Sequence, residues 1–292
     1  MIVRVPASSA NLGPGFDSFG IAWQMYNKIT FDLTEKGTKV IGCDSRYLGE
    51  NNLAVRAFRH TQLRCGVGGG GLCVQFLDTH IPVSRGLGSS AALIAAGVTA
   101  ADALCELHLT PEEKLDLAAE IEGHPDNVAA ARFGGLSASL MVGAHVITRR
   151  FPVSGRLFFN ILIPPYELST AQSRAVMPSA VSLSDAVHTL SRAALLPRAL
   201  ADGDAELIRL AMDDCLPQPY RFPLIKGIET AKKLSEDAGA IALCISGAGS
   251  SLLCCSDSEK CSERMEQALA EELPLWELRP VKADESGAYI LA

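Results

Sequence analysis

The chain lacks the features of several protein classes. It has no basic stripe, and its net charge of −7 argues against nucleic acid as a partner. Its nine cysteines include no CxxC pair and no His/Cys cluster at zinc spacing, so we expect reduced thiols. The longest small-apolar run, 91–101, is too short for a membrane span, and the first ten residues lack a signal-peptide core. These absences predict a cytoplasmic globular protein.

The chain is rich in the residues that build a core. Hydrophobic residues make up 48% of its 292 positions and charged residues 20%, enough for one large domain or two of ordinary size. Segments with strand-like and helix-like patterns occur along the whole chain. We predict one domain over residues 1–152 and a second over 153–292.

The most informative segment is PVSRGLGSSAA, from Pro82 to Ala92. Gly86 and Gly88 precede two serines and an alanine-rich apolar run, so a helix should begin near Ser89 or Ser90 with serine as its N-cap. The first N–H groups of a helix are free, and glycines let the backbone approach a bulky anion. The segment predicts a phosphate cradle; a Gly-Ser turn before a buried helix is the simpler alternative.

Three better-known loop patterns fit less well. No Gly-Lys pair occurs, which excludes a Walker loop, and no Gly-x-Ser-x-Gly elbow supports a serine hydrolase. Residues 86–91 match the loose dinucleotide pattern Gly-x-Gly-x-x-Gly/Ala. That pattern should follow a strand directly, whereas a polar connection separates it from the expected strand 72–77.

Candidate polar residues stand on both sides of this segment. Asn11 and Asp17 lie in a loop rich in Pro, Gly and Ser that follows a short expected strand, 2–5. A helix should begin at Thr110-Pro111 and end at Gly123, which puts Glu120 and Glu122 near its C-terminus, where the helix dipole disfavours acids. A nearby cation would explain the two acids. An Asx turn and solvated surface glutamates are the simpler readings.

More candidates follow in the chain. His124, Asp126 and Asn127 form a polar turn between two helical pieces. Thr170 and Arg174 would share a helix face, and Arg221 stands in a proline-flanked loop; an arginine fork suits a carboxylate, although each alone could be a surface charge. A second glycine-rich loop, 246–251, joins two expected strands and could be only a tight hairpin.

Five of these segments together resemble a known family. PASSANLGPGFDSFG, PVSRGLGSSAA, EGHPDN, STAQSRAVMP and ISGAGSS are similar, in order, to segments of the homoserine kinases, a branch of the GHMP kinases (galacto-, homoserine, mevalonate and phosphomevalonate kinases). The resemblance implies a two-domain α+β fold, with a left-handed βαβ element in the first domain and a ferredoxin-like second domain. It also implies ATP-dependent phosphorylation of the hydroxyl of L-homoserine.

The resemblance carries roles to particular positions. Mg²⁺ would be bound by Ser90 and Glu120, with Glu122 as the other choice of acid. The catalytic set would be Asn127, Ser90 and Glu120. Asn127 stands where other members have an aspartate base, so we expect transfer without a strong general base and Asp126 pointing away. ATP would be bound by Pro82, Val83, Ser84, Arg85, Gly86, Leu87, Gly88, Ser89, Ser90, Ala91 and Ala92, with Gly247 and Gly249.

The acceptor site is implied in the same way. Asp17 would bind the amino group, and Arg174 with Arg221 the carboxylate. A homodimer is compatible with this assignment. Another hydroxyl acceptor (threonine, pantoate or mevalonate) and a non-catalytic ATP sensor remain alternatives. The full set of expected homoserine-binding residues is Asn11, Asp17, His124, Asn127, Thr170, Arg174 and Arg221.

Overall fold

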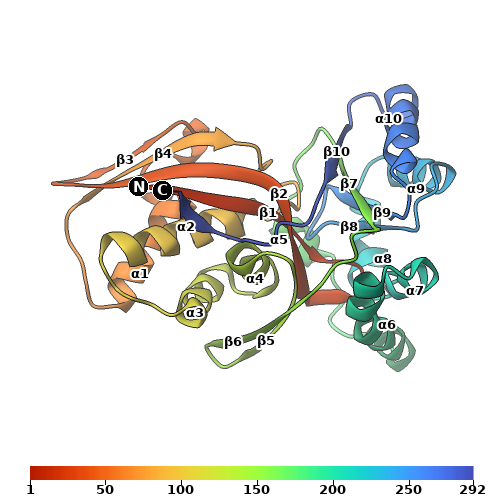
Figure 1. Cartoon of the computed structure of the whole chain (residues 1–292), viewed down its shortest axis with the longest axis horizontal. Coiled ribbons are helices and arrows are strands. Elements are labelled where there is room, and N and C mark those ends of the chain that lie inside the picture. The colour runs from red at the N-terminus through yellow and green to blue at the C-terminus, as the bar shows by residue number, and fades with distance from the viewer. Residues whose placement is uncertain (292) are drawn as a thin grey trace.

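A computed structural model describes residues 1–291 and contains two sheets (Figure 1). The larger sheet has the strand order β11-β1-β2-β4-β3, and a hairpin of β5 and β6 is attached to β2. Its strands are β1 (Ile2–Asn11), β2 (Gly15–Thr34), β3 (Thr38–Ile41), β4 (Gly71–Thr79), β5 (Leu136–Val142), β6 (His145–Phe151) and β11 (Tyr289–Leu291).

Four helices pack on one face of this sheet (Figure 1). The central one, α2, is buried along most of its length, which explains its alanine-rich sequence: small side chains let neighbouring helices approach closely. At Gly97 a Cβ would clash with the backbone of α1. The helices are α1 (Leu53–Arg64), α2 (Ser89–Leu104), α3 (Pro111–Glu122) and α4 (Asp126–Phe133), with the 3₁₀ turns η1 (Ser45–Tyr47) and η2 (Gly49–Asn51) before α1.

The smaller sheet has the order β10-β7-β9-β8, and every neighbouring pair is antiparallel. Along the chain its elements run β7, α9, β8, β9, α10, β10, which is the ferredoxin-like arrangement expected for the second domain. Five further helical segments lie between β7 and α9. The bounds are β7 (Phe158–Ile163), α5 (Thr170–Ala175), α6 (Leu183–Asp202), α7 (Ala205–Ala211), α8 (Pro217–Arg221), η3 (Phe222–Leu224), α9 (Ile228–Asp237), β8 (Ala242–Ile245), β9 (Leu252–Ser256), α10 (Lys260–Glu272) and β10 (Glu277–Val281).

The two sheets are not separated by a single cut in the sequence. The predicted division at 152/153 falls in the connection between β6 and β7. The last strand, β11, then returns to the larger sheet and pairs with β1, so that Ile2 lies opposite Leu291. The approach to β11 is fixed by Asp284, which accepts a hydrogen bond from the hydroxyl of Tyr26 at 2.7 Å. The region 153–292 therefore supplies strands to both sheets.

The predicted N-terminal loop is mostly strand. β1 extends to Asn11 and β2 begins at Gly15, whereas the sequence suggested a strand ending at Val5 followed by a long loop. The difference arises because Ala7, Ser8 and Ser9 are small enough to be buried on both faces of β1, which packs against α2 and α4, although they resemble turn formers in sequence. Among the helices of the described residues 1–291, none has both the length and the apolar character needed to cross a membrane.

The start of α3 is confirmed in detail. Thr110 accepts a hydrogen bond from the N–H of Glu113 at 3.1 Å, and the Glu113 carboxylate accepts one from the N–H of Thr110 at 2.8 Å. This capping box fixes the helix that carries Glu120 and Glu122.

We therefore expect Thr110→Ala to lower the free energy of unfolding by about 1 kcal/mol, because one end of the box is lost. Glu113→Gln is the matched control, since glutamine can still complete the box. Urea unfolding of the two variants measures the difference; equal losses would show that the box contributes nothing specific.

Candidate active site

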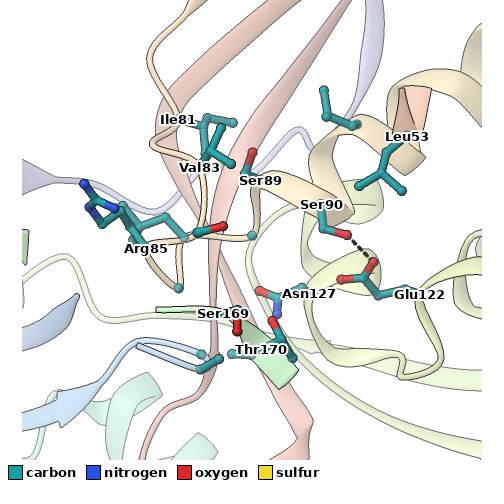
Figure 2. A pocket seen from close by; sticks show the side chains of 18 of the residues that line it. Leu53, Ile81, Val83, Arg85, Ser89, Ser90, Glu122, Asn127, Ser169 and Thr170 are labelled. Atoms are coloured by element: carbon teal, nitrogen blue, oxygen red, sulfur yellow. Dashed lines mark hydrogen bonds between the residues drawn. The ribbon is translucent and has the colours of Figure 1, made fainter. Parts of the chain in front are cut away.

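One cavity of about 710 Å³ draws its walls from both halves of the chain. Its lining includes the loop of residues 83–88, which was predicted to bind phosphate and is called the phosphate loop below, the α3–α4 turn and the start of α5 (Figure 2). The end of α8 and the loop around Gly247 line it as well. The structure brings together every residue expected to bind the acceptor, although they are spread over more than two hundred positions of the chain: Asn11, Asp17, His124, Asn127, Thr170, Arg174 and Arg221.

The phosphate loop enters α2 as predicted, with one difference. α2 begins at Ser89, but its N-cap is Gly88 in the left-handed region, with φ of 65°, and no side chain caps the helix. Neither the Ser89 nor the Ser90 hydroxyl therefore caps the helix. Residues 83–90 line the cavity, as do Gly247 and Gly249. Of the other predicted nucleotide contacts, Pro82 does not line the cavity, and Ala91 and Ala92 are buried in the core.

The loop glycines are needed for a reason that the sequence did not indicate. We expected them to admit an anion. In the structure, a Cβ on Gly86 would clash with the carbonyl oxygen of Ser246, and one on Gly88 would clash with the side chain of Ser8. These glycines therefore let the loop pack against β1 and against the second glycine-rich loop.

The second glycine-rich loop supports the first through buried hydrogen bonds. The Ser246 hydroxyl lies 2.6 Å from the carbonyl oxygen of Gly86 and 2.6 Å from the Ser9 hydroxyl. Trp23 Nε1 donates to Ser9 at 2.7 Å. A carbonyl can only accept, so Ser246 donates to Gly86 and Ser9 donates to Ser246. Residues 246–251 connect β8 to β9 and also hold the phosphate loop.

The two candidate acids of α3 lie on different sides of the helix. Glu120 faces His60 and Arg64, each at 3.4 Å, and it does not line the cavity. Glu122 accepts a hydrogen bond from Ser90 at 2.5 Å (Figure 2). Two positions along an α-helix correspond to a rotation of about 200°, which explains the separation. The choice of Glu120 beside Ser90 is therefore wrong, and the other choice, Glu122, occupies that place.

The Glu122 carboxyl is partly removed from solvent. Burial raises its pKa, and the Ser90 hydrogen bond and the positive charge of His124 only partly offset that effect. Among the described residues, 1–291, its hydrogen bonds end at Ser90. A partly buried carboxylate that is hydrogen-bonded to a hydroxyl, without an ion pair to a basic side chain, is well suited to bind a cation.

An ion pair dominates the other end of the cavity. Arg174 donates two hydrogen bonds to Asp17, at 2.7 and 3.2 Å. The Arg174 and Arg221 guanidinium groups lie 5.5 and 5.1 Å from the ring centre of Phe16. Arg221 is only 2% exposed and donates to the carbonyl oxygens of Gly247 and Ser173. Burial, followed by repulsion from Arg174, lowers the pKa of Arg221. Arg221 is therefore not a surface charge, whereas Arg174 is exposed but is paired with Asp17 at the cavity wall.

Asn11 joins the acceptor end to the Gly247 loop. Its Nδ2 donates to the Gly247 carbonyl at 2.8 Å, and its Oδ1 accepts the N–H of Asp17 at 3.2 Å. Asn11 and Asp17 both have positive φ, 72° and 54°. Asparagine and aspartate tolerate this region better than most residues. Asn11 does hold the turn, as the simpler reading proposed, but the Asp17 carboxylate faces Arg174.

His124 and Asp126 form a second pair. His124 Nδ1 lies 2.7 Å from Asp126 Oδ1, which also accepts the N–H of Asn127 at 2.6 Å. Burial alone would lower the pKa of His124, but the Asp126 hydrogen bond and the surrounding carboxylates raise it. The expectation that Asp126 points away is wrong: polar atoms of Asp17, His124 and Asp126 lie within 4.8 Å of one another. Such a group could also hold a cation, although Asp17 is already paired with Arg174.

The sequence analysis missed a large part of the cavity wall. Ile81 and Leu53 lie on one side of the two loop serines, and Asn127 and Thr170 lie on the other (Figure 2). In sequence these apolar cavity residues cannot be distinguished from core residues, because both fit the same hydrophobic patterns of strands and helices. Among these residues, only the polar pair Asn51-Asn52 just before α1 could have indicated a site. The missed lining includes Asn52, Leu53, Arg56, Phe76, Ile81 and Leu93.

The packing of the phosphate loop can be tested with two alanine substitutions at positive φ. Gly88→Ala adds a clash with Ser8 to the strain at φ of 65°, whereas Gly143→Ala has nothing within 4 Å at φ of 61°. We expect Gly88→Ala to cost about 1–3 kcal/mol more in free energy of unfolding than Gly143→Ala, and to weaken ATP binding. Urea unfolding and nucleotide titration measure both effects; equal behaviour of the variants would contradict the packing role.

Comparison with known proteins agrees with this geometry. Models of the GHMP kinases N-terminal and C-terminal domains match residues 52–135 and 196–275. The homoserine kinase of Clostridium botulinum (strain ATCC 19397 / Type A) is 39% identical over 290 residues, which cover 99% of this chain and 97% of the relative.

Solved structures extend the comparison. The homoserine kinase of Cytophaga hutchinsonii superposes with a TM-score of 0.89 at 28% identity, over 100% of this chain and 97% of that one. The L. major mevalonate kinase, at 16% identity and a TM-score of 0.72 over 97% and 96% of the two chains, shares the fold. With two sheets, a glycine-serine loop at a helix start and a homoserine kinase relative 39% identical over nearly the full length of both chains, this chain belongs to the homoserine kinase family of the GHMP kinases.

Proposed function

We propose that the protein transfers the γ-phosphoryl group of ATP to the side-chain hydroxyl of L-homoserine, which yields ADP and O-phospho-L-homoserine. In this step the hydroxyl oxygen bonds to the γ-phosphorus, the bond to the β-phosphate bridging oxygen breaks, and the hydroxyl proton is released. The observation that carries the proposal is an Asp17–Arg174 pair with a buried second arginine, all in the cavity that contains the phosphate loop. The names and full-length coverage of the relatives support it.

The charges of the cavity suit a zwitterion. An α-ammonium group can pair with Asp17 while the α-carboxylate pairs with Arg174 and Arg221, so one internal ion pair is replaced by contacts of both signs with the substrate. Pantoate and mevalonate carry a carboxylate but no ammonium group. Either would take Arg174 from Asp17 and leave that carboxylate unpaired, which is costly in a partly buried site.

The nucleotide fits the remaining part of the cavity. The triphosphate would lie at the N-terminus of α2, where free N–H groups and the helix dipole favour negative charge. The apolar wall formed by Leu53, Phe76 and Ile81 would contact the base. This arrangement directs the γ-phosphate toward Asn127 and Thr170, on the acceptor side of the loop.

Ser90 and Glu122 are our proposed Mg²⁺ ligands. Their hydroxyl and carboxylate oxygens are the donors that this ion prefers, and the partly buried Glu122 carboxylate would gain a compensating charge. When bound, the ion would neutralise charge on the β- and γ-phosphate oxygens.

The side chains around the acceptor hydroxyl favour positioning over base catalysis. A raised pKa keeps His124 protonated to a higher pH than usual, and a protonated imidazole cannot accept a proton. Asp126 already accepts from Asn127 and lies against His124. We propose that the proton passes to solvent or to the phosphate. If Asp126→Asn abolished turnover while both substrates still bound, Asp126 would be the base instead.

Substitutions of the two α3 acids test the metal ligands. Glu122→Gln should raise the Mg²⁺ concentration for half-maximal activity at least about tenfold, whereas Glu120→Gln should leave it unchanged. Because the pKa of Glu122 is raised, protons compete with the ion at a higher pH than for an ordinary carboxyl, so the Mg²⁺ requirement should rise as pH falls toward that pKa. Steady-state Mg²⁺ titrations at several pH values measure both effects. Equal effects of the two substitutions would reject Glu122.

The acceptor is tested by ADP release with L-homoserine, L-threonine, pantoate and mevalonate offered separately. We expect turnover on homoserine, and a rise in its KM of about 10- to 100-fold in Arg174→Ala and Asp17→Asn, since each loses a charge-assisted contact. Exposed Arg149→Ala is the control. Preference for another acceptor would refute the amino-acid site, and nucleotide binding without turnover on any would indicate a non-catalytic sensor.

A further inference from the structure

Ser8 occupies a position between the two parts of the reaction. It lies on β1 with 0% of its surface exposed, and its N–H donates to the carbonyl oxygen of Leu87 in the phosphate loop at 3.1 Å. Its hydroxyl donates to Oδ1 of Asn127 at 2.8 Å. The neighbouring Gly88 has no room for a Cβ because the Ser8 side chain fills that space. One residue thus contacts the loop on the donor side and the amide on the acceptor side.

The hydrogen bond determines what Asn127 presents to the cavity. An amide has an acceptor end and a donor end, and its orientation is set by its partners. With Oδ1 bound by Ser8, the NH₂ group of Asn127 is the end left for the cavity that the residue lines. Two N–H donors would attract the oxygens of a transferring phosphoryl group, whereas the reversed amide would place an oxygen against them.

We propose that Ser8 is a positioning residue for phosphoryl transfer: it holds the Asn127 amide with its donors toward the cavity and fixes that amide relative to the phosphate loop. The inference rests on the proposed function, since it assigns Ser8 a role through Asn127. Ser8 does not touch either substrate in this account. Its backbone contact with Leu87 and its side-chain contact with Asn127 together set the geometry between donor and acceptor.

A double-mutant cycle tests this role. Ser8→Ala should lower kcat about tenfold, the size expected from losing one orienting hydrogen bond, with both KM values changed less than about twofold. Asn127→Ala should lower kcat at least as much. In the double variant, Ser8→Ala should cause no further loss, because the group that Ser8 orients is gone. A merely structural role for Ser8 would not give this dependence.

A buried serine elsewhere serves as the matched control. Ser235 is 1% exposed and donates to the carbonyl oxygen of Ala231 within α9, away from the cavity. Ser235→Ala should lose a comparable amount of stability with kcat unchanged. Should Ser8→Ala fail to fold, Ser8→Cys keeps a weak donor of similar size. Ser8→Cys should lower kcat when Asn127 is present, and should have no effect on kcat when it is added to Asn127→Ala.

The outcomes separate the two proposals. If Asn127→Ala leaves kcat unchanged, the role of Asn127 in the proposed function fails. If Asn127→Ala is impaired but Ser8→Ala is not, the inference about Ser8 fails alone. Equal losses from Ser8→Ala with and without Asn127 would also overturn it, because Ser8 would then act through the loop and not through the amide.

Discussion

The site depends on a buried chain of hydrogen bonds that runs from the indole of Trp23 through Ser9 and Ser246 to the carbonyl of Gly86. Trp23, Ser9 and Ser246 are fully buried, so their polar groups must keep their partners or incur a desolvation penalty. These hydrogen bonds connect β1 and β2 of the larger sheet, the phosphate loop and the β8–β9 loop of the smaller sheet. A displacement of the phosphate loop would leave several buried groups unpaired at once.

Electrostatic balance is the second requirement of the cavity. Acidic and basic side chains meet at its acceptor end, where Asp17 pairs with Arg174 and Asp126 with His124. Arg221 is left to bond backbone carbonyls, and its depressed pKa records the cost of keeping that charge buried. In the proposed function, the substrate carboxylate would relieve this cost. The pairing of Asp17 with Arg174 also neutralises both charges when no substrate is bound.

Features that depend on residues close in sequence could be predicted, whereas the direction in which a side chain points and its burial could not. The Thr110 capping box needs only residues three apart, so the start of α3 was predictable. The choice between Glu120 and Glu122 required knowing which face of α3 meets α2, which depends on tertiary packing. The loop glycines were correctly singled out but for an incomplete reason, because the atoms they accommodate come from Ser8 and Ser246. The resemblance to a family supplied the acceptor residues, which no local pattern connects.

The pairing of β11 with β1 has a consequence for the newborn chain. During synthesis β1 and β2 leave the ribosome first, and helices α1–α4 can already cover one face of their sheet. The outer edge of β1 stays open until the last strand has emerged, and an open edge can pair with other chains. The small, tightly buried residues of β1 thus belong to the strand that is synthesised first, but the outer edge of that strand is paired last, when β11 joins the sheet.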